Sequence, residues 1–231
     1  MPAPVTDPSP LTLRVWADLQ ARLADTPSPE GLAAMLRYLA KWRSELLANT
    51  LAQHSGLVVQ TGPFKGMRYS VRASEGARAP RLLGTYESTL WPVIADIIAA
   101  RYGLVIDIGA AEGYYAVGLA RALPGARVIA RDSDVVAQAL CQRLAEDNGV
   151  AGRVEIGGLW SHADFALCTT ARTVVLCDIE GAEDDLLDPV RAPGLGAADI
   201  LVEVHEAVHP GLVERLRKRF ARTHDITRHD R

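Results

Sequence analysis

One stretch of the chain, 104–124, constrains the fold more than any other, because it joins an apolar run, a glycine turn and a helical segment. Residues 104–106 predict a strand that is covered on both faces, since every position is apolar. Gly109 and Gly113 bracket a turn where the backbone adopts positive φ angles or approaches a ligand closely. A helix is predicted over 114–123. Such a turn places free backbone N–H groups at the carboxyl end of the strand, which suits a ligand rich in hydrogen-bond acceptors.

The glycine pattern does not fit a dinucleotide. A dinucleotide site has the pattern G-x-G-x-x-G/A, in which the second glycine admits a pyrophosphate and the last small residue allows close helix packing. Counting from Gly109, the third position is Ala111 and the sixth is Tyr114. A pyrophosphate would therefore meet a methyl group, and the packing position holds a phenol. The pattern that remains is D-x-G-x-x-x-G, beginning at Asp107, and it argues against NAD. A tight turn that binds no ligand is the alternative interpretation.

Composition restricts the class of protein. The 231 residues are 48% hydrophobic and 23% charged, as in an ordinary globular protein long enough for one large α/β domain with an appendage. The formal charge of −3 argues against a general attraction to nucleic acid or to an anionic membrane. The three cysteines show no zinc-binding spacing, and no leader or membrane-length apolar run is present. These features predict a cytoplasmic protein with reduced thiols and no membrane partner.

The chain divides into three predicted segments. Residues 1–55 form an N-terminal helical extension, with amphipathic helices expected at 11–24 and from 29 to about 53. Residues 56–83 form a β-hairpin and linker, and 84–231 form the α/β domain. The apolar faces of the N-terminal helices predict core cover or a contact within a homodimer, and a dedicated partner site is the alternative.

The third segment repeats a strand–helix rhythm after the central turn. That rhythm predicts a parallel, Rossmann-like sheet with right-handed crossovers and helices on both faces. The further strands are expected at 127–130, 153–156, 173–177 and 200–204, and helices at 87–101, 135–147 and 211–221.

An acid at the carboxyl end of the second strand is a candidate ligand contact. Asp132 lies 25 residues beyond Asp107. A carboxylate in that place accepts both ribose hydroxyls of a nucleoside at once. A solvated loop acid is the alternative interpretation, because Asp134 is equally well placed. We favour Asp132 as the ribose contact.

Four blocks together resemble the FkbM-type group of class I S-adenosylmethionine (SAM) dependent methyltransferases. They are VIDIGAAEGYY at 105–115, the acid block at Asp132, CDIEGAE at 177–183 and LVEVH at 201–205. The resemblance spans roughly 84–219, and the DIEGAE block is its most group-specific part. It implies a class I methyltransferase sheet, SAM as the cofactor and methyl transfer as the activity.

The resemblance also implies a set of cofactor contacts. They are Asp107, Gly109, Ala110, Gly113, Asp132 and Ser133, with Gly158 or Leu159 near the adenine. The sequence departs from the group at Arg131-Asp132-Ser133, where the group has an aromatic-Glu-Pro sequence, so the ribose contact is shorter by one methylene. Class I folds also add an antiparallel hairpin after strand five, and only 223–231 remain here to form it.

Polar side chains converge where strands four and five are expected to end, the side on which open α/β sheets bind ligands. Glu203 and His205 share a face of strand five, and Asp178 and Glu180 do so beyond strand four. Methyl transfer to a hydroxyl requires removal of a proton, so we interpret His205 as the general base, oriented by Asp178 or Glu203. An imidazole that merely satisfies neighbouring carboxylates is an equal alternative.

The same residues have a competing use. Asp178, Glu203 and His205 would make a mixed oxygen and nitrogen metal site of the kind that orients a catechol-like acceptor. Magnesium, however, prefers oxygen ligands and keeps several waters. We therefore favour a site with no required metal.

Aromatic side chains are the candidate walls of the acceptor pocket. The predicted acceptor contacts are Tyr86, Glu87, Trp91, Tyr114, Trp160 and His162. For His162 the alternative is a surface histidine. Aromatic walls without a sustained basic track predict a small hydroxylated acceptor.

Other functions stay open beside O-methylation of a small hydroxylated metabolite. The basic run at 215–222 would suit phosphates in a nucleic-acid modifier, but it lacks interleaved aromatic residues. A SAM-using enzyme of another kind would displace the sulfonium with SAM's own aminobutyrate chain and release methylthioadenosine. A third alternative is a protein that binds SAM without any reaction.

Overall fold

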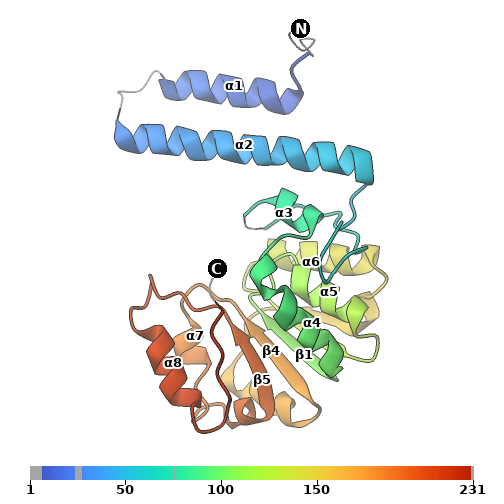
Figure 1. Cartoon of the computed structure of the whole chain (residues 1–231), viewed down its shortest axis with the longest axis vertical. Helices are drawn as coiled ribbons and strands as arrows, with labels where there is room; N and C mark the ends of the chain where they lie inside the picture. Colours follow the sequence, from blue (N-terminus) through green and yellow to red (C-terminus); the bar gives the residue numbers. More distant parts are fainter. Residues whose placement is uncertain (1–6, 24–27, 75, 230–231) are drawn as a thin grey trace. The chain divides into compact units, whose positions relative to one another are not determined.

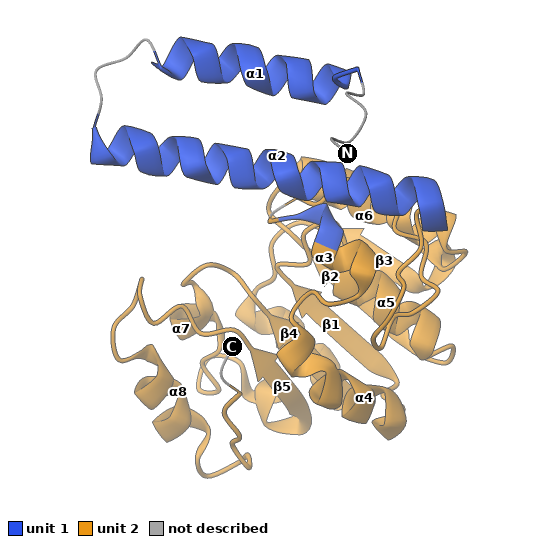
Figure 2. Ribbon diagram, turned by 45° about the horizontal axis from the view of Figure 1, so that its top comes forward, with its two compact units in different colours: residues 1–56, 77–79 blue, residues 57–76, 80–231 orange. Residues whose placement is uncertain are grey.

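The computed structural model of the chain describes residues 7–23, 28–74 and 76–229 (Figure 1). The predicted helix end at Ala24 lies outside the described residues. None of the described helices is long and apolar enough to cross a membrane. The chain forms two compact units, residues 1–56 with 77–79 and residues 57–76 with 80–231 (Figure 2).

The first unit contains two long helices, α1 (Pro10–Leu23) and α2 (Pro29–Ser55), which lie side by side (Figure 2). α2 begins where the sequence predicts, because Ser28 Oγ accepts a hydrogen bond from the Gly31 N–H at 3.0 Å. It ends at Gly56, whose φ of 73° lies in the left-handed region that favours glycine.

Five parallel strands form the sheet of the second unit in the order β3-β2-β1-β4-β5, which confirms the predicted Rossmann-like fold. The order reverses between β1 and β4, and ligands of open α/β sheets bind in the crevice beside such a point. The strands are β1 (Leu104–Ile108), β2 (Arg127–Arg131), β3 (Val154–Gly157), β4 (Thr173–Cys177) and β5 (Ala198–Val202).

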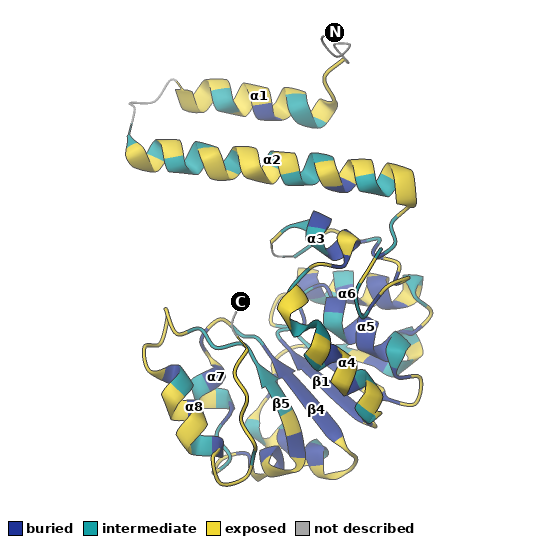
Figure 3. Ribbon diagram, viewed as in Figure 1, coloured by how far each residue is buried: buried dark blue, intermediate teal, exposed yellow. Residues whose placement is uncertain are grey.

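The two central strands, β1 and β4, are buried at every position (Figure 3). Leu104 and Ile106 belong to a core that also contains Phe165 and Leu212. Val105, which lies between them in sequence, points to the opposite face of the sheet and is 0% exposed as well. Because both faces are covered, these strands are mostly apolar and do not alternate, and Asp107 and Thr173 are their buried polar residues.

Helices flank the strands. The predicted helices at 135–147 and 211–221 are α6 (Val135–Asp147) and α8 (Leu212–Phe220), and α5 (Tyr114–Ala122) follows the glycine turn. The helix predicted at 87–101 begins later, because Glu87 has a left-handed φ of 44°. It consists of η1 (Ser88–Leu90) and α4 (Trp91–Ala100). Five short helices were not predicted from periodicity: α3 (Arg78–Leu83), η2 (Ala151–Arg153), η3 (His162–Thr169), α7 (Glu183–Leu186) and η4 (Pro193–Ala197).

The end of strand five differs from the prediction. β5 stops at Val202, so Glu203 and His205 follow the strand instead of sharing one of its faces. The apolar pattern continues past Val202, but pairing with β4 ends there, where Cys177 is the partner. Within the part of the chain described up to residue 229, no strand follows β5, so this part lacks the antiparallel hairpin that class I folds add.

The predicted β-hairpin is present as a short antiparallel pairing rather than as two regular strands. One isolated bridge joins Val58 to Arg68, and the Val59 N–H donates to the Met67 carbonyl at 2.8 Å. Val59, Met67 and Tyr69 are almost fully buried. Packing of these side chains into the second unit, rather than a long ladder of backbone bonds, holds the segment.

A buried ion pair anchors this segment to the glycine turn. Arg81 and Glu112 are 3% and 0% exposed, and their Nε and Oε1 atoms lie 2.7 Å apart. Glu112 also accepts hydrogen bonds from the Tyr69 hydroxyl at 2.7 Å and the Ser74 N–H at 2.8 Å. Because Glu112 belongs to the turn after β1, these bonds connect the 57–76 segment to the region where a ligand is expected.

Removal of this anchor should destabilise the second unit. We expect Glu112→Ala to lower the free energy of unfolding by about 3–5 kcal/mol, because it leaves a buried guanidinium without its counter-charge. Urea unfolding followed by circular dichroism measures the change. Glu155→Ala is the matched control, since its ion pairs with Arg127 and Arg131 involve a half-exposed carboxylate, and it should cost less than about 1 kcal/mol. Equal losses of unfolding free energy in the two variants would contradict the role of Glu112 as a buried anchor.

Candidate functional site

An open cleft of about 1840 Å³ lies at the carboxyl ends of the strands and continues beside β5. Loops that follow all five strands contribute to its wall, which explains why its residues are far apart in the sequence. Seven of the predicted cofactor contacts line it: Asp107, Gly109, Ala110, Asp132, Ser133, Gly158 and Leu159.

The glycine turn is shaped by two close backbone approaches. Gly109 has a φ of 82°, and a Cβ atom there would lie 1.6 Å from the Asp178 carbonyl oxygen, so only glycine fits. Gly113 has a φ of 88°, and a Cβ atom there would lie 2.5 Å from Cys141 Sγ. Gly113 is not among the residues that line the cleft. Its position against α6 indicates a packing role, whereas Gly109 brings the turn against the loop after β4.

Asp107 carries an oxygen that lacks a partner. The residue is 5% exposed, and its Oδ2 atom makes no hydrogen bond with the described residues. The pKa of Asp107 is raised to about 7, chiefly by burial; the Ala116 N–H opposes the shift, and the charges of Asp178 and Asp132 add to it. A buried carboxyl group is costly without partners, so an unpaired oxygen in a cleft wall marks a place for a ligand that donates a hydrogen bond or carries positive charge.

The structure shows which of the two candidate acids, Asp132 or Asp134, faces the cleft. Asp132 accepts a hydrogen bond from the Ala111 N–H at 2.8 Å and therefore contacts the glycine turn. Asp134 instead caps α6, where its side chain accepts from the Val136 N–H at 2.8 Å. Asp132 lines the cleft and Asp134 does not. A carboxylate has about four lone-pair sites, so Asp132 can accept further hydrogen bonds from a ligand.

The loop after β3 forms one end of the cleft. Leu159 is 84% exposed there, and Gly158 precedes it. Trp160 lines the cleft next to them, but it is 8% exposed and packs edge-on against Phe165 with ring centroids 5.8 Å apart. The Arg131 guanidinium lies 5.6 Å from the centre of the Trp160 ring. Trp160 was predicted as an acceptor wall, and the structure places it beside the predicted adenine contacts.

Aromatic rings form another part of the wall. Tyr86 and Tyr114 lie edge to face at 5.6 Å, and both line the cleft. Tyr115 lines it too and donates a hydrogen bond to Glu87 at 2.6 Å. The Arg81 guanidinium lies 3.9 Å from the centre of the Tyr86 ring. Neither Tyr115 nor Arg81 was predicted from the sequence to line the site, although the Tyr-Tyr pair after the turn was a signal for Tyr115.

Two predicted acceptor contacts lie outside the wall. The Trp91 indole donates to the Gly84 carbonyl at 3.1 Å, and His162 Nε2 lies 2.8 Å from the Asp185 carbonyl oxygen. Neither Trp91 nor His162 is among the residues that line the cleft. Their hydrogen bonds hold loops together.

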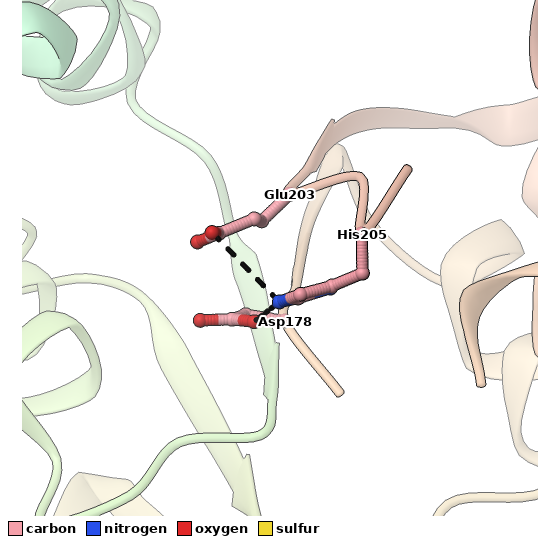
Figure 4. Close-up of side chains that lie close together, drawn as sticks. All are labelled: Asp178, Glu203 and His205. Carbon is pink, nitrogen blue, oxygen red and sulfur yellow. Dashed lines mark ion pairs between the residues drawn. The ribbon is translucent and has the colours of Figure 1, made fainter. Parts of the chain in front are cut away.

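The predicted cluster at the ends of β4 and β5 is present (Figure 4). His205 Nε2 lies 3.5 Å from Asp178 Oδ1 and 3.8 Å from Glu203 Oε1, and Glu180 Oε2 is 3.3 Å away. These side chains lie close together although β5 ends early, because the Glu203 N–H still donates a hydrogen bond to the Cys177 carbonyl at 3.0 Å.

The carboxylates and the imidazole occupy different depths. Asp178, Glu180 and Glu203 line the cleft, whereas His205 does not, and its side chain is 14% exposed. A molecule in the cleft therefore meets the carboxylates first. In the sequence analysis His205 was expected to face the acceptor with a carboxylate behind it, and the observed order is the reverse.

The cluster holds protons near neutral pH. The pKa of Asp178 is raised to about 7, chiefly by burial and then by the charge of Glu203, while His205 opposes the shift. Burial lowers the pKa of His205, but the hydrogen bond and charge of Glu183, with Glu180 and Asp178, outweigh that effect and hold it above its usual value. A group that titrates near neutrality is suited to general acid–base chemistry.

Glu183 is a member of the cluster that sequence reasoning missed. It is 0% exposed, and its Oε1 atom lies 2.8 Å from His205 Nδ1. The only signal was its membership of the DIEGAE block, because neither periodicity nor spacing showed that this acid faces inward.

Comparisons with known proteins find distant structural likenesses alone. No family model matches the sequence, and no curated protein does. The O-methyltransferase TomG from Streptomyces achromogenes, solved with SAM, is 17% identical over 60% of this chain and 67% of its own, with a TM-score of 0.44. An O-methyltransferase from Bacillus cereus, solved with S-adenosylhomocysteine (SAH), is 11% identical over 91% of this chain and 86% of its own, with a TM-score of 0.43. With TM-scores below 0.5 these likenesses carry no argument about activity, which depends on the residues of the cleft.

Proposed function

We propose that this protein is a SAM-dependent methyltransferase that methylates a hydroxyl group on a small molecule. One observation carries the proposal. A single cleft contains two acids placed for a cationic nucleoside ligand, Asp107 and Asp132, and a proton-holding cluster around Asp178. The DIEGAE and LVEVH blocks support the further proposal that the chain belongs to the FkbM-type group.

The residues of the cofactor end fit SAM chemically. SAM carries an ammonium group and a ribose diol, and it lacks a pyrophosphate. The unpaired oxygen of Asp107 suits the ammonium, and the free lone pairs of Asp132 suit the ribose hydroxyls. Gly158 and the exposed Leu159 offer an apolar contact for the adenine. Ala111, where a dinucleotide turn has glycine, argues against NAD.

The acceptor end supplies the remaining requirements of methyl transfer. When bound, SAM provides a methyl group on an already activated sulfonium. The protein must align the acceptor, exclude water and take up the hydroxyl proton. In our proposal Tyr86 and Tyr114 bound the acceptor, and the Asp178 carboxylate takes the proton. His205 lies behind Asp178 and orients it.

The charges of the site also support a small acceptor rather than a nucleic acid. Glu87, Asp178, Glu180 and Glu203 line the cleft and repel a phosphate backbone. The basic run on α8 is partly neutralised, because Arg215 and Arg219 pair with Asp184 at 2.8 and 2.9 Å.

SAM binding should depend on Asp132 far more than on Asp134. Asp132→Ala should weaken SAM by about 1.5–3 kcal/mol for each ribose hydrogen bond lost, whereas Asp134→Ala removes only a helix cap. Isothermal titration with SAM, SAH and NAD measures this, and the wild type should bind the first two and not NAD. Tight binding of NAD without binding of SAM would refute the proposal.

The product distinguishes the alternative uses of SAM. Methyl transfer leaves SAH, intramolecular displacement leaves methylthioadenosine, and a protein that only binds SAM leaves it intact. Chromatography after incubation with a panel of hydroxylated metabolites and RNA fragments separates the three. Methylation of RNA alone would contradict the proposed acceptor class.

Turnover should depend on Asp178 and on pH. Asp178→Asn should lower kcat by about 10²–10⁴-fold and leave the SAM affinity nearly unchanged, because a base is needed only for the proton. The base must be ionised, so kcat should fall as the pH drops through about 7, the raised pKa of Asp178. Steady-state assays from acid to alkaline pH test both effects.

His205→Ala and a chelator are assayed in parallel. A strong loss with His205→Ala is expected, since Asp178 would lose its partner. A larger loss than with Asp178→Asn would return the role of base to His205. Loss of wild-type activity with chelator would support the competing metal site, in which Asp178, Glu203 and His205 bring ligand atoms within 4.8 Å of one another.

The N-terminal helices support a proposed homodimer. α1 and α2 bury one residue each, Val15 and Ala48, while Trp16 and Leu36 are 63% and 70% exposed. Leu32 on the same face of α2 is 62% exposed. A helix pair with so little core of its own gains apolar burial when a second copy covers this face.

Charges on that face should prevent dimerisation. We expect the double variant Leu32→Glu and Leu36→Glu to sediment as a monomer, while the wild type sediments as a dimer in analytical ultracentrifugation. The exposed pair Arg37→Glu and Lys41→Glu, on another face of α2, is the control and should leave the dimer intact. A monomeric wild type at micromolar concentration would refute the homodimer.

A further inference from the structure

Glu183 is the one fully buried acid of the cluster. It is the first residue of α7, and its side chain is 0% exposed. Burial of an ionised carboxylate is costly unless hydrogen bonds and an opposite charge compensate it. The partners of this carboxylate therefore indicate why the acid is there.

Two groups meet the same oxygen of Glu183. The Ile179 N–H donates to Oε1 at 3.1 Å, and His205 Nδ1 lies 2.8 Å from it. Because Oε1 accepts a hydrogen bond from the Ile179 N–H, we assign it as the acceptor of the second contact too, with the proton on Nδ1. The bond holds the imidazole ring in one orientation, as second-layer carboxylates do for functional histidines.

With Nδ1 held, the other ring nitrogen is directed toward the cleft wall. Nε2 lies 3.3 Å from Glu180 Oε2, 3.5 Å from Asp178 Oδ1 and 3.8 Å from Glu203 Oε1. Glu183, His205 and Asp178 thus form a continuous carboxylate–imidazole–carboxylate series that leads from the core to the cleft.

We propose that Glu183 is a positioning residue for the methyl-transfer site: it holds His205 Nδ1–H so that Nε2 faces Asp178, and the imidazolium form, which carries a proton on Nε2 as well, donates to the Asp178 carboxylate and orients it toward the acceptor. The proposal deepens the proposed function and rests on it. A role limited to folding would require only an acceptor for the Ile179 N–H and would not depend on the state of the imidazole.

Long-range ¹H–¹⁵N NMR of the imidazole groups tests the bond directly and needs no substrate. The wild type should show a proton on His205 Nδ1, shifted downfield by its hydrogen bond, and His205→Gln identifies the signal by removing it. Glu183→Ala should lose the downfield signal. Glu183→Gln should retain it, because the amide oxygen still accepts from both donors.

Kinetics with SAM then test the positioning role. Glu183→Ala should lower kcat by at least about 10-fold, less than the 10²–10⁴-fold expected for loss of the base, with the SAM dissociation constant unchanged. Glu183→Gln should restore most of the lost kcat. Asp184→Asn is the matched control, since it changes the next acid of α7, which pairs with Arg215 and Arg219, and should leave kcat and the signal unchanged.

Each outcome has one meaning. Loss of both the signal and kcat in Glu183→Ala, with rescue of both in Glu183→Gln, supports the proposal. A wild-type His205 protonated only on Nε2 overturns it, and this result needs no variant to fold. A Glu183→Ala protein that keeps either its kcat or its downfield signal overturns it as well. Absence of SAH from the wild type would refute the proposed function, whereas the NMR result reports on the Glu183–His205 bond independently.

Discussion

The close packing of two backbone turns determines where the parts of the site lie. The turn after β1 approaches the loop after β4 so closely that a side chain on Gly109 would occupy the same space as the Asp178 carbonyl. Because β1 and β4 are neighbours at the reversal of the sheet, this contact places the proposed cofactor end of the cleft beside the carboxylate cluster around Asp178. The charge of Asp178 even contributes to the raised pKa of Asp107.

Three buried acids around this contact differ in what compensates them. Glu112 has a guanidinium, a hydroxyl and a backbone N–H, and it joins the 57–76 segment to the turn. Glu183 has a backbone N–H and an imidazole, which connects it to the cleft. Asp107 and Glu183 each keep one oxygen without a hydrogen-bond partner among the described residues, but of the two only Asp107 lines the cleft. Because an unpaired buried oxygen is costly, Asp107 is the place where the proposed ligand would complete the structure.

Local pattern predicted much of the fold. The apolar run at 104–106 predicted a strand covered on both faces, and the strand–helix rhythm predicted β4 and both ends of α6. The short helices were not predicted, since a few residues show no period. The end of β5 was misplaced by two residues, because pairing with β4 rather than composition decides where a strand stops.

The features of the candidate site are also of two kinds, those set by local sequence and those set by tertiary contacts. Backbone-dependent features, the strained turn at Gly109 and the acids at the carboxyl ends of strands, follow from the sequence because φ preferences and strand ends are local. Whether Asp132 or Asp134 faces the cleft was decided by the start of α6. Trp91 and His162 are instead bonded to backbone carbonyl groups, of Gly84 seven residues earlier and of Asp185 in a more distant segment. The depth of His205 and its bond to Glu183 were likewise set by packing of α7 against the segment after β5. Side-chain direction and burial arise from contacts between elements that are remote in the chain, so only the tertiary structure determined which acid stands behind the histidine.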